Sequence, residues 1–172
     1  DPLKRPPNAE IELAGSKSIT NRALLIAALA EGKSTLSRAL FAEDTLAMIN
    51  CLQAFGINIK HDHATATIAI NGNGGELETP QKELWVRQSG TTARFILPLA
   101  ALAKAPIEVD GDNQIRSRPQ HDLLLALNEL GVEITHNGEM GHLPLTIDGS
   151  NLTVTDIRVT GETSSQYLSA LL

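Results

Sequence analysis

Several classes of protein are excluded by what this sequence has little of. A single cysteine, Cys51, allows no disulfide within the chain and is typical of a reduced compartment. Phe, Trp and Tyr make up 3% of the residues, and 14 Lys and Arg stand against 20 Asp and Glu, which gives a net charge of −6. Nucleic-acid binding needs basic surfaces and aromatic stacking platforms. The chain is therefore expected to bind no nucleic acid.

Long apolar stretches are also absent from the sequence. The longest, Ala23–Ala30, is far shorter than the roughly 20 residues that a membrane-spanning helix requires. The opening residues, DPLKRPPNAE, contain no apolar segment of the kind found in signal peptides. These observations predict a cytoplasmic protein with no membrane contact.

What the sequence does contain is an internal repeat of about 75 residues. The stretch AALAEG at 27–32 returns as AALAKA at 100–105, and LQAFGINI at 52–59 returns as LNELGVEI at 127–134. INGNG at 70–74 has its counterpart in IDGSN at 147–151, and Arg22 is matched in the same way with Arg94. Four landmarks in the same order indicate copies of one structural unit.

Each copy is predicted to be a βαβαββ unit, so the chain is expected to have an α/β fold of repeated units. The first unit spans 11–80, the second spans 81–154, and a third begins at 155–172 and is truncated. The expected helices are 18–30, 44–55, 90–103 and 119–130. The expected strands are Glu12–Ala14, Ser34–Ser37, Ile57–Lys60, Thr67–Ile70, Glu83–Val86, Ile107–Asp110, Glu133–His136, Leu145–Asp148 and Asp156–Thr160. Because the third unit stops inside an apolar helix, we expect a fragment of a longer protein.

Two stretches near the first helix could hold a phosphate. Gly32-Lys33-Ser34 looks like the end of a P-loop, but Ala27, inside an expected helix, stands where that motif needs its first glycine. We therefore interpret Gly32 as the residue that ends this helix. Gly15-Ser16-Lys17-Ser18 lies between an expected strand and the start of a helix, where free backbone N–H groups stabilise an anion. The second stretch is the better candidate.

Similar clusters occur at the later helix starts. Arg22 lies one helical turn after Ser18, and Gly90 opens a helix four residues before Arg94. Arg116 and Arg118 precede the helix expected to start at Pro119. The helix of the third unit begins with three uncharged hydrogen-bonding side chains, Ser164, Ser165 and Gln166.

These clusters have two readings. Serine helix caps with solvated basic side chains would give the same sequence pattern. If the units pack side by side, however, the helix starts converge, and their basic groups could bind one anionic ligand that carries hydroxyl groups. Arginine suits such a ligand because its guanidinium can donate two parallel hydrogen bonds to a phosphate or a carboxylate.

Several motifs resemble one enzyme family. GSKSITNRALLIAALAEG is similar to the N-terminal signature of the 5-enolpyruvylshikimate-3-phosphate synthases (3-phosphoshikimate 1-carboxyvinyltransferases). SGTTAR, IRSRP and SSQYLSALL follow in that family's order and at about its spacing. The resemblance runs from about Ile11 to Leu172 and covers the first two-fifths or so of a full family member. It implies six βαβαββ units in two domains, with the active site between the domains.

The resemblance also implies a reaction. Enolpyruvyl transfer from phosphoenolpyruvate to the 5-hydroxyl of shikimate 3-phosphate releases phosphate and proceeds through a tetrahedral intermediate, with no metal or other cofactor. It belongs to the shikimate pathway of aromatic amino-acid biosynthesis. Carried over by motif, Lys17 is the catalytic residue and touches both substrates, and Arg94 supports the site. The shikimate 3-phosphate residues are Lys17, Ser18, Arg22, Ser164, Ser165 and Gln166, and the phosphoenolpyruvate residues are Lys17, Gly90, Arg118 and Gln166.

The chain departs from the family pattern near the implied phosphoenolpyruvate and glyphosate site. Gln88 and Ser89 stand where the family commonly has Asn-Ala, and Phe95 stands where many members have proline. We expect these three residues to weaken inhibition by glyphosate. The acidic proton-transfer residues and further phosphate-binding residues of the family lie in the second domain, which this chain lacks. The chain alone is therefore expected to bind substrate at best, without turnover.

Two alternatives stay open at this stage. The related UDP-N-acetylglucosamine enolpyruvyl transferases have a similar fold, but they carry Lys-Asn at the position of Lys17-Ser18 and usually a reactive loop cysteine. A non-catalytic module that binds a phosphate ligand is the other alternative. His61 and His63 alternate on one expected strand, but no third ligand is evident from the spacing, so we expect no metal site.

Overall fold

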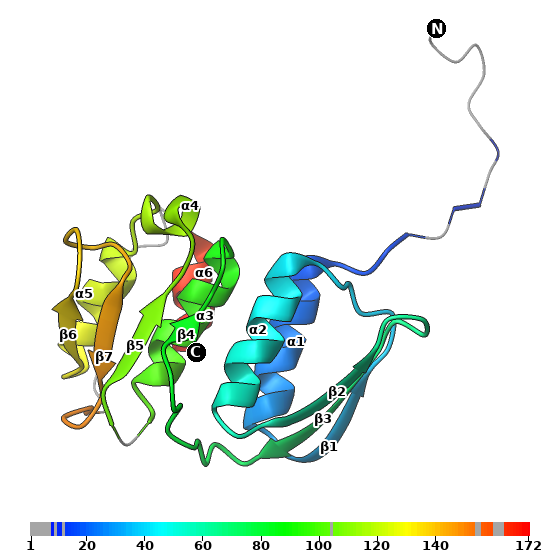
Figure 1. Cartoon of the computed structure of the whole chain (residues 1–172), viewed down its shortest axis with the longest axis horizontal. Helices are drawn as coiled ribbons and strands as arrows, with labels where there is room; N and C mark the ends of the chain where they lie inside the picture. The colour runs from blue at the N-terminus through cyan, green and yellow to red at the C-terminus, as the bar shows by residue number, and fades with distance from the viewer. Residues whose placement is uncertain (1–7, 9, 12, 104, 154–155, 160–163) are drawn as a thin grey trace, which may run out of the picture.

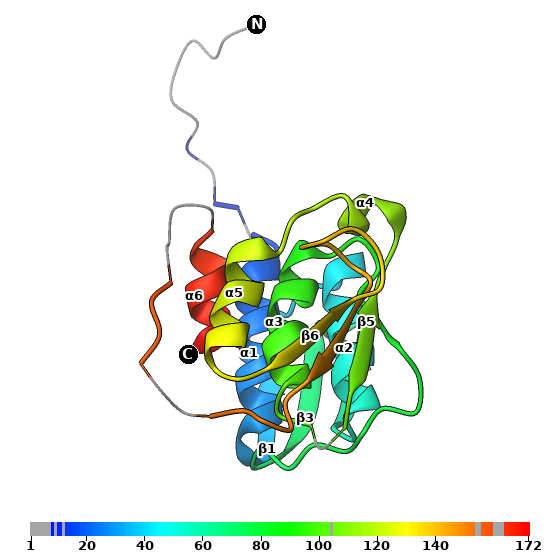
Figure 2. The same cartoon turned by 90° about the vertical axis from the view of Figure 1, so that its left-hand side faces the viewer.

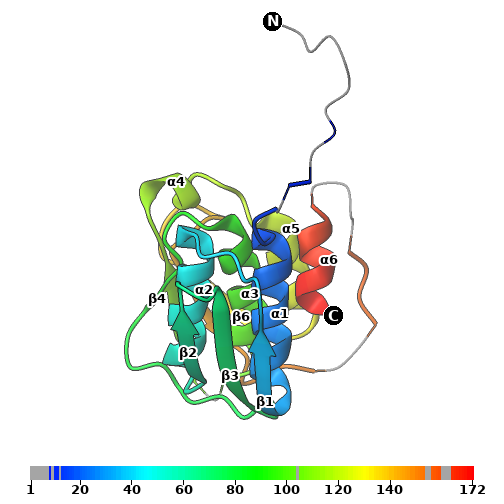
Figure 3. The same cartoon turned by 90° about the vertical axis from the view of Figure 1, so that its right-hand side faces the viewer.

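The computed structural model describes residues 8, 10–11, 13–103, 105–153, 156–159 and 164–172. Two β-sheets enclose a layer of helices that lie side by side (Figures 1–3). The helices are α1 (Lys17–Leu29), α2 (Glu43–Ala54), α3 (Gly90–Ala100), α4 (Asn113–Arg116), α5 (His121–Glu129) and α6 (Ser165–Leu171). The strands are β1 (Glu31–Leu36), β2 (Asn58–Asp62), β3 (Thr67–Asn73), β4 (Leu84–Trp85), β5 (Ile107–Asp110), β6 (Glu133–His136) and β7 (Leu145–Asp148).

The strand order confirms the repeat. The first sheet has the order β1-β3-β2, and the second repeats it as β5-β7-β6 with β4 added parallel to β5. All other pairs are antiparallel. One continuous apolar core runs through both units, and its largest members include Leu24, Phe55, Ile68 and Ile96. The mixed α/β prediction is confirmed, whereas the unit boundaries 11–80, 81–154 and 155–172 stay a prediction.

Two expected strands do not form in the residues that the structure describes. Leu13 and Ala14, and likewise Asp156–Val159, have no regular secondary structure; Glu12 and Thr160 lie outside the described residues. The equivalent strand of the second unit, β4, is held by its pairing with β5 (Leu84 opposite Val109). Leu13 is 71% exposed, so it packs against no comparable sheet edge. The short helix α4 was not predicted because it has too few residues to show an apolar period.

The interpretation of Gly32 was wrong. Helix α1 ends at Leu29 with the cap residue Ala30, and Gly32 lies within β1 opposite Gly72. Its φ of 94° is open to glycine and strained for other residues. Lys33 follows in the same strand and is exposed, so the segment forms a strand edge and no phosphate-binding loop.

One pair of glycines explains why INGNG and IDGSN recur. A β-carbon at Gly72 would lie 2.2 Å from the carbonyl oxygen of Ala30, and one at Gly149 would lie 1.7 Å from that of Ala101. In each unit the chain leaving the central strand therefore passes directly beneath the end of the unit's first helix. Only a residue without a side chain allows this approach.

Cys51 is expected to be chemically inert in the folded chain. Its thiol is 2% exposed, and burial raises the pKa from 9.0 to about 12. At pH 8 a thiol reagent such as DTNB should react with it at least ~100-fold more slowly than in urea, because the thiolate is the nucleophile. Because the folded pKa is raised, the associated stability is complete below about pH 9 and is lost as the pH rises toward 12. Rapid labelling of the native chain at pH 8 would contradict this.

Candidate functional site

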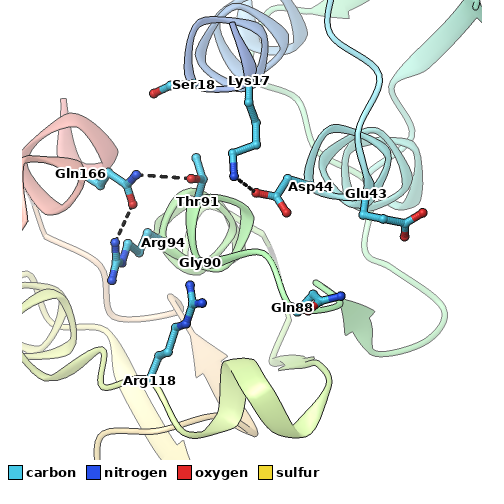
Figure 4. Close-up of a pocket in the computed structure, with 10 residues that line it drawn as sticks. All are labelled: Lys17, Ser18, Glu43, Asp44, Gln88, Gly90, Thr91, Arg94, Arg118 and Gln166. Atoms are coloured by element: carbon cyan, nitrogen blue, oxygen red, sulfur yellow. Dashed lines mark hydrogen bonds and ion pairs between the residues drawn. The ribbon is translucent and has the colours of Figure 1, made fainter. Parts of the chain in front are cut away.

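Four helices begin around one pocket of about 400 Å³ (Figure 4). The starts of α1, α2, α3 and α6 contribute to it, and the segment between α4 and α5 adds Arg118. The pocket is lined by Lys17, Ser18, Glu43, Asp44, Gln88, Gly90, Thr91, Arg94, Arg118 and Gln166. Six of the nine predicted site residues are therefore brought together.

Serine residues cap three of these helices. Ser16, Ser89 and Ser164 precede α1, α3 and α6, and their hydroxyl oxygens accept hydrogen bonds from the backbone N–H groups of Ile19, Thr92 and Gln166. Each cap satisfies one of the free N–H groups at its helix start. The capping interpretation thus holds for these serines, while Lys17, Gly90 and Gln166, at the starts of the same helices, line the pocket.

Lys17 faces the pocket from the first turn of α1. Its Nζ lies 2.6 Å from Oδ2 of Asp44 on α2, and the two side chains are 49% and 19% exposed. Figure 4 shows this pair bridging the two helices. An incoming anion would therefore compete with Asp44 for the ammonium group.

Arg94 connects α3 to α6. Its Nη1 donates to Oε1 of Gln166 at 2.6 Å and to Oγ of Ser164 at 3.4 Å. The Gln166 amide in turn donates to Oγ1 of Thr91 at 3.3 Å, so the amide is held in one orientation (Figure 4). Nε of Arg94 is buried without a hydrogen-bond partner among the described residues. An unpaired buried donor costs folding free energy, which points to a role for this side chain beyond stability.

Arg118 and Arg116 have different environments. Nη1 of Arg118 lies 3.2 Å from the position that a β-carbon would take at Gly90, so the guanidinium packs against the start of α3 (Figure 4). Arg116 donates from Nε to Asp110 at 2.9 Å and from Nη2 to the second oxygen of the same carboxylate. This bidentate pair gives Arg116 a structural role. Of these two arginines, Arg118 is the one that lines the pocket.

The pocket carries uncompensated positive charge. Asp44 is paired with Lys17, and Glu43 is paired with Arg87, which does not line the pocket. Within the described ranges, neither Arg94 nor Arg118 forms an ion pair with a carboxylate. Two guanidinium groups at converging helix starts favour a ligand with more than one negative charge.

Arg22, Ser164 and Ser165 lie beside the pocket and do not line it. Arg22 donates to the carbonyl oxygen of Ser18 at 3.3 Å and to Oγ of Ser169 at 3.4 Å, and its guanidinium lies 5.4 Å from the ring centre of Phe95. Ser165 is exposed. Arg22 thus reaches the site through Ser18, whose hydroxyl it also contacts.

The match between Arg22 and Arg94 is one residue out of register. The caps Ser16 and Ser89 align Asn21 with Arg94 and Arg22 with Phe95. The two arginines are therefore not equivalent positions of the repeat. Arg22 lies over Phe95, which is the residue at its equivalent position in the second unit. Sequence matching missed this because both arginines fall in the same part of their helices.

Several pocket residues were not among the predicted site residues. Asp44, Glu43 and Thr91 line the pocket, and Ser169 contacts Arg22. Acidic residues in the first turn of a helix are ordinary dipole partners, so Asp44 and Glu43 gave no separate signal. Thr91 lies inside the SGTTAR motif and could have been found there.

The described part of the chain has neither a metal-binding cluster nor a membrane-spanning helix. It contains no group of three or more His, Cys, Asp or Glu residues that could hold a metal ion. None of its helices is long and apolar enough to cross a membrane.

Neutralising Asp44 is expected to strengthen anion binding. An Asp44→Asn variant removes a carboxylate that competes for Lys17, so affinity for inorganic phosphate should rise about fivefold at low salt. Isothermal titration would measure it, and Glu139→Gln, at an exposed position outside the pocket, is the matched control. Unchanged or weaker binding in Asp44→Asn would mean that the carboxylate is needed to place the lysine.

Comparisons with known proteins agree with the motifs. Residues 4–172 match the family described as EPSP synthase (3-phosphoshikimate 1-carboxyvinyltransferase). The chain is 44% identical to a 3-phosphoshikimate 1-carboxyvinyltransferase of Trichormus variabilis and 42% identical to one of Methanothermobacter thermautotrophicus, over 99% of this chain in both cases. It spans 40% and 38% of the lengths of these relatives.

A solved structure shows the same fold. EPSP synthase from Acinetobacter baumannii superimposes with a TM-score of 0.86 at 27% identity, over 94% of this chain and 36% of that one. The repeated α/β architecture is thus shared with that enzyme.

Proposed function

The chain belongs to the EPSP synthase family, and on that premise we propose that it supplies part of the active site of an enolpyruvyl transferase. The reaction moves the enolpyruvyl group of phosphoenolpyruvate to the 5-hydroxyl of shikimate 3-phosphate and releases phosphate, in the shikimate pathway. The observation that carries the proposal is the pocket at four helix starts, in which Arg94 and Arg118 form no ion pair with a carboxylate of the described residues.

The proposed roles follow from where the side chains lie. Lys17 exchanges its ion pair with Asp44 for contacts with both substrates, since its side chain faces the pocket and is 49% exposed. Arg118, beside Gly90, binds phosphoenolpyruvate, and Gln166 lies between the two substrates. Shikimate 3-phosphate is held by the remaining polar groups around α1 and α6, namely Ser18, Arg22, Ser164 and Ser165.

These groups would act by orientation and charge. Both substrates are anions and repel each other, so fixed cations and N–H donors lower the free energy needed to bring them together. The same donors stabilise charge that develops at the reacting centre. The roles require no cofactor.

We propose that turnover requires residues beyond this chain. The chain spans about 40% of its relatives' length, and the family's acidic proton-transfer residues are expected in the second domain. The chain itself would then bind shikimate 3-phosphate without converting it. We also propose a cytoplasmic protein without nucleic-acid partners, in keeping with its net charge of −6 and single cysteine.

The UDP-N-acetylglucosamine alternative is not favoured. The matched family and the relatives described above are 3-phosphoshikimate 1-carboxyvinyltransferases. In addition, Cys51 is buried with a raised pKa, which does not suit a reactive cysteine.

Titration with shikimate 3-phosphate, followed by backbone amide NMR, tests the proposal. We expect shifts to cluster at 15–22 and 164–166 and to disappear in a Lys17→Ala, Arg22→Ala variant. Lys33→Ala, at the rejected P-loop-like stretch, is the matched control and should bind as the parent chain does. Binding of an equal affinity in all three proteins, or no shifts in a folded chain, would refute the half-site.

We propose that glyphosate inhibits the full enzyme weakly and correspondingly binds this chain weakly. Of the three departures from the family pattern, Gln88 lines the pocket, whereas Ser89 is a buried cap and Phe95 lies beneath Arg22. Gln88 should therefore have the direct effect on the inhibitor. In competition with phosphoenolpyruvate, Gln88→Asn is expected to increase glyphosate affinity severalfold, and Ser89→Ala should change it less; the reverse order would contradict this assignment.

A further inference from the structure

Tyr167 lies in the first turn of α6, next to the pocket residue Gln166, and contacts Arg94 and the segment that carries Arg118. It is the only tyrosine among five aromatic residues of the chain (three Phe, one Trp, one Tyr). Its side chain is 1% exposed. The position would ordinarily be assigned to core packing alone.

The ring supports Arg94. The guanidinium carbon of Arg94 lies 5.1 Å from the ring centre, within the range in which a cation is attracted to an aromatic face. The same guanidinium donates to Ser164, the residue that caps α6, and to Gln166 in the first turn of α6. The Tyr167 ring therefore covers one face of the Arg94 guanidinium, while the Nη1 group donates hydrogen bonds to the start of α6.

The hydroxyl supports Arg118. It donates to the carbonyl oxygen of Pro119 at 3.2 Å. Pro119 directly follows Arg118, and proline restricts the backbone of the residue before it. Gln120, which is fully buried, adds a second constraint by donating from Nε2 to the carbonyl oxygen of Arg118 at 3.2 Å. The short segment that carries Arg118 is thus tied to α6 at one atom and to its own buried side chain at another.

We propose that Tyr167 is a positioning residue that places Arg94 through its ring and Arg118 through its hydroxyl. The proposal rests on the proposed function, because it assumes that both arginines face the substrates. Through this one side chain, the start of the third unit sets the geometry of basic groups that belong to the second. An apolar residue of similar size would fill the core equally well and provide neither contact.

Two substitutions separate the two roles. Tyr167→Phe keeps the ring and removes the hydroxyl, and Tyr167→Leu removes both. Phe95→Leu is the matched control, because it removes the ring beneath Arg22 and contacts neither Arg94 nor Arg118 in the described contacts.

Arginine side-chain NMR of the ligand-free chain reports the placement directly. Arg94 should show an upfield ring-current shift that persists in Tyr167→Phe and is lost in Tyr167→Leu. Signals of Arg118 should change in both variants, and Phe95→Leu should affect Arg22 alone. Unchanged Arg94 signals in Tyr167→Leu, or unchanged Arg118 signals in Tyr167→Phe, would overturn the inference. The Phe variant keeps the test decisive even if the Leu variant fails to fold.

Binding measurements then connect the placement to the substrates. Shikimate 3-phosphate affinity should fall about tenfold in Tyr167→Leu and stay within about twofold in Tyr167→Phe. Phosphoenolpyruvate affinity, measured with shikimate 3-phosphate present, should fall about threefold or more in both variants. Equal losses for both ligands in both variants would overturn the division of roles. If the parent chain binds neither ligand while the arginine signals behave as expected, the proposed function fails and the placement stands.

Discussion

A Gly149→Ala substitution is expected to lower the free energy of unfolding by about 4 kcal/mol or more. The new β-carbon would lie 1.7 Å from the carbonyl oxygen of Ala101 and 2.6 Å from its carbonyl carbon. Both are backbone atoms, so a side-chain rotation cannot relieve the clash. The chain leaving β7 and the end of α3 must separate, which opens the core of the second unit. Urea unfolding followed by circular dichroism measures the loss.

Gly75→Ala provides the control for this experiment. A β-carbon at Gly75 would meet no atom within 4 Å, although its φ of 87° is strained for alanine. Gly75→Ala should therefore lower the free energy of unfolding by only about 1–2 kcal/mol, which is the cost of a left-handed conformation for a non-glycine residue. Similar losses in the two variants would show that the close approach at Gly149 is relieved cheaply.

Arg94→Met is expected to weaken shikimate 3-phosphate binding by about 50-fold, since hydrogen bonds to a charged group contribute about 1.5–3 kcal/mol each. The variant loses the donors to Gln166 and Ser164 and the guanidinium over Tyr167, and it keeps an unbranched apolar side chain. Stability should fall as well, by about 1 kcal/mol or more, because the hydrogen bonds that join α3 to α6 are lost, although the buried Nε has no partner among the described residues. Isothermal titration measures the affinity and a thermal melt the stability.

Arg87→Met is the matched control for Arg94. Arg87 has the same charge, lies two residues before the SGTTAR motif, and is paired with Glu43 at the surface. Its removal leaves the pocket carboxylate of Glu43 unpaired, so shikimate 3-phosphate affinity should fall, but by no more than about fivefold, because an exposed ion pair contributes little. If both variants bound equally well, net charge rather than the placement of Arg94 would govern the pocket.

The regular parts of the fold could be predicted because their signals are local. The strands Ile107–Asp110, Glu133–His136 and Leu145–Asp148 were predicted with the bounds that the structure has. Gly56 and Gly131 mark helix ends through positive φ values of 85° and 82°. Glu12–Ala14 failed as a strand in its described residues because strand formation there depends on a partner edge, which no local pattern reports.

The candidate site was predicted only in part, because its local signals are visible in the sequence and its contacts between elements are not. Helix starts with Gly, Ser, Lys and Arg are visible in sequence, and the repeat indicated that they converge. The pairing of Lys17 with Asp44 and the stacking of Arg22 on Phe95 join residues from different elements. Such contacts depend on how the helices pack, and a single sequence contains no direct record of that packing.

The pocket is lined by residues at the starts of α1, α2, α3 and α6, so any bound anion would connect helices from distant parts of the chain. A ligand that bridges α1, α3 and α6 would add to the apolar core and to the hydrogen bonds of Arg22 and Arg94 that already join these helices. By linkage, occupancy raises the free energy of unfolding by RT ln(1 + [L]/Kd), or about 2.7 kcal/mol at a hundredfold excess over Kd. The melting temperature of the chain should therefore rise with ligand concentration, and the helices around the pocket should unfold more nearly as one unit.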